Sequence, residues 1–147
     1  MSTTLSLCHF VFNTYCRRMT INPLNEEALY RFIWKQLEKK NCKLLRIGGI
    51  ANHIHLLVDI HPSLSMSMLA GEIKRLSSMW IKSSTLFPEF EGWGKEYFGF
   101  SKSLKDKDTV IEYIKNQKIH HRNATFEDEI RMLVEEEGRE WDGKLLT

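Results

Sequence analysis

The sequence predicts an α+β fold: a ferredoxin-like (RRM-like) sandwich of an antiparallel sheet and helices, with further helices at the C-terminal end. The expected order is strand, helix, strand, strand, helix, strand, then helices, which is the order of that sandwich. Residues 53–60 carry an apolar side chain at every even position, as in a strand with one face on a core. The chain has 147 residues, 42% hydrophobic and 27% charged, so residues 1–147 are expected to form one domain.

The first half of the sandwich is expected as a strand, a helix and a pair of strands. Residues 4–18 are rich in β-branched and aromatic side chains and predict a strand. Asn25 can cap a helix, and the apolar positions after it repeat with helical spacing to about Asn41. Residues 42–61 predict two strands, with a turn or bulge at Gly48 and Gly49. The expected apolar face of the helix consists of Ala28, Leu29, Phe32, Ile33 and Leu37.

The second half is expected as a helix, a loop and a short strand. Pro62 and Ser63 are residues that open helices, and an apolar stripe with helical spacing follows them. Residues 85–93 contain Pro88 and a glycine and predict a loop. Residues 97–101 predict the last strand. The apolar stripe of this helix consists of Met66, Leu69, Ile73, Leu76 and Trp80.

Two more helices are expected beyond this strand. Asp106 or Asp108 is expected to cap a helix that runs to about His121, and Thr125 is expected to cap another over residues 126–137. Residues 124–147 are an acidic helical tail with a net charge of −5, whereas residues 1–123 carry +7, for a total of +2. A basic body predicts a polyanionic partner, and scattered solubilising charge is the alternative.

Cysteines and hydropathy indicate a cytoplasmic protein. The three cysteines, Cys8, Cys16 and Cys42, have no CxxC spacing, so neither a disulfide framework nor a zinc knuckle is expected. The N-terminus lacks the basic and apolar regions of a secretory signal, and no apolar run reaches the about 18 residues of a membrane span. A reducing cytoplasm is therefore the expected location.

A pair of histidines marks the strand expected over residues 53–60. His53 and His55 alternate with the apolar positions, so both rings point away from the apolar face. Residues two apart on a strand are about 6.5–7 Å from each other, which lets two imidazoles converge on one divalent metal. The alternative is a pair of exposed histidines on a polar strand face.

A tyrosine and a glutamine share one face of the third expected helix. Tyr113 and Gln117 stand four residues apart, which places them side by side on a helix. Ordinary amphipathic packing is the alternative for such a tyrosine. In a chain that also carries the two histidines, however, the pair offers a hydroxyl nucleophile and a further oxygen ligand.

These segments together resemble the single-tyrosine HUH transposases of small bacterial insertion sequences, the IS200-like family, which includes REP-associated tyrosine transposases. The similar motifs are NHIHLLV at residues 52–58, WGKEYFGFS at residues 93–101 and YIKNQ at residues 113–117. The HFVF segment at residues 9–12 and the Lys74-Arg75 pair are also similar, and the resemblance runs from about residue 5 to residue 137. Residues 13–17 (NTYCR) depart from the Thr-Lys-x-Arg run of many members, which puts details of DNA contact in question.

The resemblance implies a specific chemistry. Tyr113 would be the nucleophile, His53 and His55 the metal ligands, and Gln117 the third ligand of a Mg²⁺ or Mn²⁺ ion. Attack by Tyr113 on single-stranded DNA, often beside a hairpin, would give a 5′-phosphotyrosine and a free 3′-OH. Because the phosphodiester energy is kept in that bond, strands can be rejoined without ATP. The chain accordingly has no GxxxxGK[ST] phosphate loop.

The DNA is expected on an open face of the sheet. Basic side chains would contact phosphates and aromatic ones would stack on bases, although a packing role is the alternative for each. The other histidines, His9, His61, His120 and His121, are expected at surface or packing positions. The basic candidates are Lys74, Arg75, Lys82, Lys95 and Lys102, and the aromatic candidates are Trp80, Trp93, Tyr97 and Phe98.

Two other classes of function are compatible with parts of this pattern. A ferredoxin-like nucleic-acid-binding module without catalysis would explain the basic body, but it gives no reason for His53, His55, Tyr113 and Gln117 together. A zinc protein built on the histidine pair is less favoured, because no suitably spaced cysteine accompanies it.

The resemblance also implies a homodimer in which the tyrosine helix acts in trans. The connection over residues 101–106 is polar, so the helix that follows it is expected to reach either protomer's sheet. A monomer with the helix packed in cis is the alternative.

Overall fold

The structure is a computed structural model that describes residues 2–141 and residue 143. Four strands form one antiparallel sheet in the order β2-β3-β1-β4. The central strands are β1 (Leu7–Asn13) and β3 (His53–Asp59), and the edge strands are β2 (Lys43–Ile50) and β4 (Phe98–Lys102). The predicted α+β architecture is confirmed.

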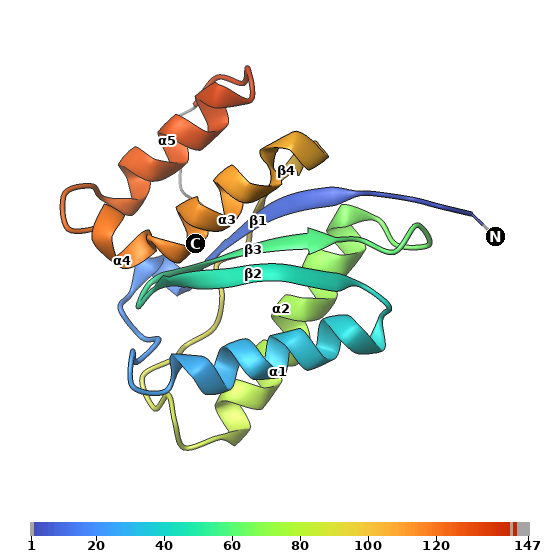
Figure 1. The fold of residues 1–147 in the computed structure, drawn as a ribbon. Coiled ribbons are helices and arrows are strands. Elements are labelled where there is room, and N and C mark those ends of the chain that lie inside the picture. The colour runs from blue at the N-terminus through green and yellow to red at the C-terminus, as the bar shows by residue number, and fades with distance from the viewer. Residues whose placement is uncertain (1, 142, 144–147) are drawn as a thin grey trace.

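Helices cover both faces of this sheet (Figure 1). The helices α1 (Glu26–Lys39) and α2 (Met66–Ser83) lie on one face, and α3 (Lys107–Lys115), α4 (Gln117–His120) and α5 (Phe126–Glu136) lie on the other. Two short 3-10 turns, η1 (Tyr15–Arg17) and η2 (Leu104–Asp106), complete the order of elements. The prediction of an open sheet face is therefore wrong. The C-terminal helices bury their apolar stripes on that face because an amphipathic helix is stabilised by such burial.

The first strand and the hairpin differ from the prediction for backbone reasons. The strand β1 ends at Asn13 rather than Arg18, because Cys16 and Arg17 take left-handed φ angles of 53° and 56°. The β2–β3 hairpin turns at residues 51 and 52, and Gly48 lies inside β2. A Cβ at Gly48 would lie 2.9 Å from the carbonyl oxygen of Ile114, so glycine lets α3 approach the sheet closely.

The helix caps also refine the prediction. The helix α2 is capped by Ser65, whose side chain accepts a hydrogen bond from the backbone N–H of Met68, so it begins later than predicted. The single helix expected up to His121 is interrupted at Asn116, whose φ and ψ of −96° and 18° are not helical. The cap at Thr125 is confirmed as a capping box with Asp128.

The main core lies between the sheet and helices α1 and α2. The even-numbered residues of β3 join it, which confirms the alternation predicted for that strand. The candidate base-stacking aromatics belong to packed clusters, which confirms the alternative of a packing role. Trp93 is buried and donates a hydrogen bond to Ser77, and Trp80 stacks on Phe32. Tyr97 packs against the main core, and Phe98 packs against a cluster under α5.

No helix among the described residues is both long and apolar enough to cross a membrane.

Candidate metal centre and tyrosine site

The two histidines of β3 meet under the C-terminal helices. His53 and His55 are completely buried, because α3, α4 and α5 cover the face on which their rings lie. Leu57, the next residue on this face, packs against Val110 and Ile114 of α3 and so anchors that helix to the sheet. The predicted shared face of the histidines is confirmed, but their surroundings are a closed interior rather than solvent.

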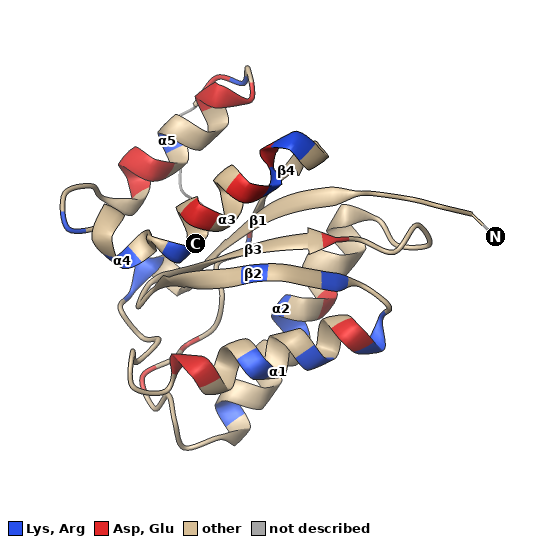
Figure 2. Cartoon of the chain, viewed as in Figure 1, with Lys and Arg blue, Asp and Glu red and all other residues tan. Residues whose placement is uncertain are grey.

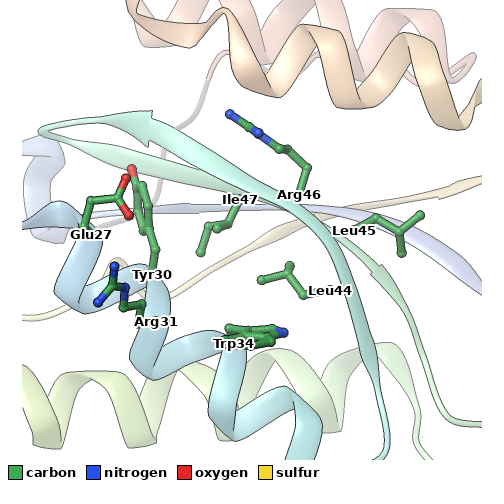
Figure 3. Close-up of a pocket in the computed structure, with 8 residues that line it drawn as sticks. All are labelled: Glu27, Tyr30, Arg31, Trp34, Leu44, Leu45, Arg46 and Ile47. Carbon is green, nitrogen blue, oxygen red and sulfur yellow. The ribbon is translucent and has the colours of Figure 1, made fainter.

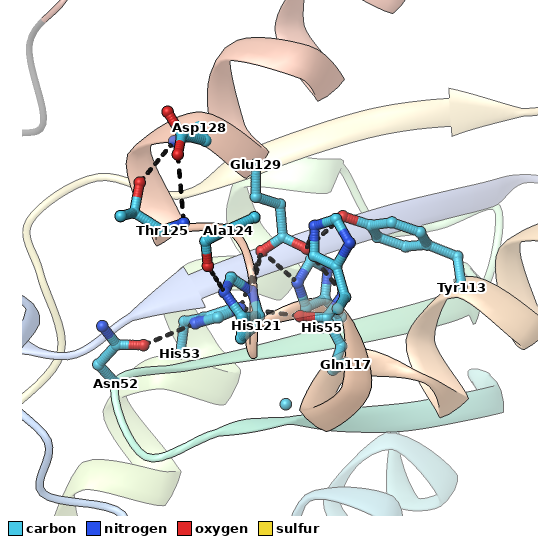
Figure 4. Close-up of polar contacts among 12 residues, drawn as sticks. Asn52, His53, His55, Tyr113, Gln117, His121, Ala124, Thr125, Asp128 and Glu129 are labelled. Carbon is cyan, nitrogen blue, oxygen red and sulfur yellow. Dashed lines mark hydrogen bonds and ion pairs between the residues drawn. The ribbon is translucent and has the colours of Figure 1, made fainter.

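A carboxylate from α5 lies at the centre of this interior (Figure 4). Oε1 of Glu129 lies 2.9 Å from Nε2 of His53 and 3.2 Å from Nε2 of His55. The same oxygen lies 2.9 Å from Nε2 of His121, in the turn after α4. Glu129 shares the buried stripe of α5 with Phe126, Ile130 and Leu133, although its side chain is charged. Such a residue is almost never fully buried without a partner, and here the histidines are its partners.

Tyr113 and Gln117 reach the other oxygen of the same carboxylate. The phenol of Tyr113 donates a hydrogen bond to Oε2 of Glu129, and the amide of Gln117 donates one to it over 2.7 Å. The side-chain oxygen of Gln117 lies 3.0 Å from Nε2 of His53. The residues that sequence spacing paired on one helix thus meet at one point, even though α3 and α4 are separate helices.

A second layer of hydrogen bonds fixes how the imidazoles are turned. Nδ1 of His53 lies 2.8 Å from the side-chain oxygen of Asn52, and Nδ1 of His55 lies 2.8 Å from Nε2 of His9. Nδ1 of His121 lies 2.8 Å from the carbonyl oxygen of Ala124. Such outer contacts orient metal-ligating histidines and select the nitrogen that faces the metal.

The donor set fits a divalent cation. Since Nδ1 of His53 faces an oxygen acceptor, the neutral ring carries its proton there and turns a lone pair on Nε2 inward. That lone pair meets Oε1 of Glu129 and the side-chain oxygen of Gln117, so three electron-rich atoms converge. A cation relieves this convergence. Imidazole, carboxylate and amide groups are ligands that Mn²⁺ and related ions accept.

Burial and charge set the protonation of the cluster. Burial lowers the pKa of His53 to about 4, despite the opposing effect of Glu129. Burial opposes charge on Glu129 as well, but its contacts with the neighbouring histidines, chiefly His121, outweigh that effect and hold its pKa well below the usual range. Burial also works against the charge of His121, but Glu129 outweighs it and raises the pKa of His121.

The nucleophile candidate is protonated in this arrangement. Burial, followed by the negative charge of Glu129, raises the pKa of Tyr113 well above its ordinary value. The phenol hydrogen bond to Glu129 therefore holds the proton on Tyr113 in the state described. Any reaction of this oxygen requires the proton to be transferred, and Glu129 is the acceptor in contact with it.

Histidines with no predicted role belong to this site. His9 is buried beside His55, and His121 contacts Glu129. His120 lies 3.9 Å from Glu129, and its Nε2 is buried without a hydrogen-bond partner among the described residues. With His53 and His55 they make five of the chain's six histidines. The imidazole of the sixth, His61, lies outside this site and contacts Ser63.

The predicted DNA-contacting cations on α2 lie apart from this cluster. Lys74 donates to the backbone carbonyls of Gly94 and Glu96, and Arg75 pairs with Glu72 on α2. Helix α2 covers the opposite face of the sheet from the histidines (Figure 1). Lys102 pairs with Glu137, whereas Lys82 and Lys95 have no ion pair among the described residues. A role of these five in DNA binding remains a prediction.

A groove lies along the edge strand β2, and Figure 3 shows the residues that line its outer part. Its outer part is a hollow of about 320 Å³ between α1 and residues 44–47 of β2. Its inner part shares Glu27, Tyr30, Arg46 and Ile47 with the outer part and ends at Gln117. The groove therefore extends from α1 along β2 to Gln117, and its lining includes none of His53, His55, Tyr113 and Glu129.

Buried histidines, a carboxylate and a tyrosine thus meet on one face of a ferredoxin-like sheet, where they offer candidate metal ligands beside a hydroxyl group. Residues 2–117 match the family described as "Transposase IS200 like", so the chain belongs to the IS200-like transposases. The match ends at Gln117. His121 and Glu129 therefore lie outside the matched segment.

Curated relatives come from the same family, and two solved structures share the fold. The chain is 29% identical over 113 residues to the transposases for insertion sequence element IS200 of Salmonella typhimurium and Salmonella typhi, covering 74% of each protein. It resembles the structure of a putative transposase from Deinococcus radiodurans R1 with a TM-score of 0.62, at 17% identity, over 80% of this chain and 95% of the other. It also resembles a REP-associated tyrosine transposase bound to a REP hairpin, with a TM-score of 0.61, at 15% identity, over 82% and 73% of the two chains.

Proposed function

We propose that this transposase cleaves and rejoins single-stranded DNA in a metal-dependent reaction, through a 5′-phosphotyrosine formed on Tyr113. The observation that carries the proposal is the convergence of the Tyr113 phenol, Gln117 and two β3 histidines on one buried carboxylate. Nucleophile, proton acceptor and metal ligands are thereby within contact of one another. That constellation fits phosphoryl transfer to a hydroxyl group.

The metal would be held by His53 and His55 together with Gln117, and Glu129 lies within reach as a carboxylate ligand. A bound Mg²⁺ or Mn²⁺ would supply positive charge for the phosphate oxygens and for the departing 3′ oxygen. His9 and Asn52 would keep the two imidazoles oriented toward that position.

The chain's own residues supply the remaining steps. The Tyr113 oxygen attacks phosphorus while its proton passes to Oε2 of Glu129, and the bond from phosphorus to the 3′ oxygen breaks. The released 3′ oxygen takes up a proton and becomes a hydroxyl group. Rejoining reverses these events: a 3′-OH attacks the phosphotyrosine, and Tyr113 recovers its proton.

Covalent trapping tests the proposal. The full chain is incubated with a labelled hairpin oligonucleotide carrying a single-stranded extension, in Mg²⁺ or Mn²⁺, and resolved under denaturing conditions. Wild type and the exposed-tyrosine control Tyr15→Phe are expected to form an adduct, whereas Tyr113→Phe is expected to form none. An adduct on Tyr113→Phe would overturn the assignment. If the wild type forms no adduct, the result favours the alternative function, a DNA-binding module without catalysis.

We further propose that the working unit is a homodimer bound to hairpin DNA. The fold resembles a transposase whose structure holds a REP hairpin. Within a single chain, Tyr113 lies beside its own His55, with ring centroids 5.7 Å apart. Exchange of α3 between protomers would build the same contact in trans.

Mixing inactive variants distinguishes the arrangements. Co-expressed His53→Ala and Tyr113→Phe chains are expected to regain cleavage if the tyrosine acts in trans, because each mixed dimer then contains one complete site. In a cis arrangement every site lacks one group and the mixture stays inactive. A monomer by light scattering at micromolar concentration would rule out the dimer.

A further inference from the structure

We propose that the groove along β2 binds single-stranded DNA. The bound segment is the one that leads to the scissile phosphate. This inference rests on the proposed function, since it assigns the path of that reaction's substrate. The groove begins at Trp34 on α1 and ends at Gln117, the predicted metal ligand. A strand lying in it would therefore run along the edge of the sheet to Gln117, beside the covered histidine cluster.

An exposed tryptophan at the outer end suits stacking on a base. The side chain of Trp34 is 46% exposed, although Trp is usually well buried. In Figure 3 its ring lies beside Leu44 at the border of the hollow. Because every base has an aromatic face, one such ring binds single strands with little sequence preference.

Cations line the groove from its outer part to its inner part. Arg31 of α1 and Arg46 of β2 are exposed, and no ion pair among the described residues involves either of them. Lys115 adds a further cation at the inner part, where its nearest acidic partner is 3.9 Å away. Figure 2 shows basic positions on β2, basic and acidic positions on α1, and further acidic positions on α3 and α5. A polyanionic strand is the occupant that this charge favours.

The acidic side chains of the groove do not cancel this charge. Glu26 is bound by Lys118 over 2.7 Å, so the pair is neutral. Glu27 is then the acidic side chain whose charge opposes those of the two arginines in the outer part. The strand β2 is also a sheet edge, and its outward backbone groups are available for hydrogen bonds to a strand in the groove.

Equilibrium binding tests the groove separately from the chemistry. The full chain carrying Tyr113→Phe, without metal, is titrated into fluorescein-labelled oligothymidylate, and anisotropy is followed between 50 and 200 mM KCl. On this background Trp34→Ala is expected to weaken binding about 5- to 150-fold, the effect of losing one base stack. Arg31→Ala with Arg46→Ala is expected to reduce the slope of log K against log salt by about 1.4.

A matched control and a duplex probe sharpen this experiment. Lys35→Ala removes an exposed cation from the same helix but lies outside the groove, and it is expected to leave affinity and slope unchanged. A blunt hairpin without a single-stranded extension is expected to bind all variants alike. Wild-type affinity and slope in both the Trp34 and the double-arginine variants would overturn the proposal.

The result also separates this groove from the proposed function and from other occupants. Loss of binding in the groove variants supports the strand path even if the wild type forms no covalent adduct. If the wild type forms an adduct but the groove variants bind DNA with unchanged affinity, the proposed strand path is wrong and the proposed reaction is unaffected. If Trp34→Ala instead turns a dimer into a monomer in light scattering, with DNA affinity unchanged, the groove holds a second copy of this chain and the proposal is wrong.

Discussion

The two faces of the sheet are built from the same strands but carry opposite chemistry. On one face, the even-numbered residues of β3 and β1 join a large apolar core under α1 and α2. On the other face, His53, His55 and His9 lie under α3, α4 and α5 around the carboxylate of Glu129. Because successive side chains of a strand point to opposite faces, the apolar residues and the polar residues of the same strands are kept apart. One face supplies most of the apolar burial, while the other buries a cluster of hydrogen-bonded polar groups.

The contrast predicts unequal losses of stability at neighbouring positions. Leu56 is buried in the large core and Leu57 in a small cluster under α3. We expect Leu56→Ala to lower the free energy of unfolding by about 3–5 kcal/mol and Leu57→Ala by about 2–3 kcal/mol, since a smaller cluster loses fewer contacts. Urea denaturation of both variants measures the difference.

The same pair sharpens the functional side of the comparison. Leu57→Ala is expected to weaken metal binding as well, because it loosens the docking of α3 and hence of Tyr113 and Gln117. Folded Leu56→Ala is expected to bind metal like the wild type. A larger loss of stability at Leu57, or equal metal binding in both variants, would contradict the division between the faces.

Replacing the central carboxylate should affect the metal and not the apolar core. We expect Glu129→Gln to weaken Mn²⁺ binding about 10- to 100-fold, the range for losing one interaction in or next to a metal's ligand shell. Glu135→Gln, at an exposed position of the same helix, is the matched control and should bind Mn²⁺ as tightly as the wild type. Calorimetry or the Mn²⁺ electron paramagnetic resonance signal measures this without DNA. Equal affinities in the two variants would remove Glu129 from the metal site.

Acid should destabilise the polar face first. The pKa of His53 is lowered to about 4, below its ordinary value near 6.5, so the unfolded chain binds more protons between these values. Stability should therefore fall as the pH drops from 6.5 toward 4, by about 1–2 kcal/mol by pH 5. His9 is shifted in the same direction, mainly by burial, and adds to the loss.

Thermal unfolding in EDTA between pH 7 and 5 measures this effect. The raised pKa of His121 acts oppositely, because its stabilising contribution is lost as the pH rises through the folded-state value. A melting temperature that stays constant or rises on acidification to pH 5 would show that the buried histidines do not control how stability changes at acidic pH.

Much of the fold followed from periodicity, and part of the site did so too. The alternation over residues 53–60 predicted which face each histidine takes, and the spacing of Tyr113 and Gln117 predicted their neighbourhood. These are local patterns, which a sequence carries directly. The family resemblance was confirmed by the match over residues 2–117.

What was missed depends on contacts between distant segments. Glu129 reaches the histidines across 74 residues of chain, and His9 reaches His55 across 46. One signal was available: Glu129 lies at a buried position of α5, between Phe126 and Ile130, where an acidic residue demands a partner. The covered face was missed because its covering depends on how α3 and α5 dock, which local spacing does not encode.

The central claim is that the polar face is a catalytic centre whose nucleophile is Tyr113. Peptide mapping of the trapped DNA adduct by mass spectrometry tests it most directly. Digestion with nuclease and trypsin should leave a 5′-phosphonucleotide on the peptide of residues 108–115, in which Tyr113 is the only tyrosine. A modified peptide from any other segment, or an unmodified 108–115 peptide from a purified adduct, would contradict the account.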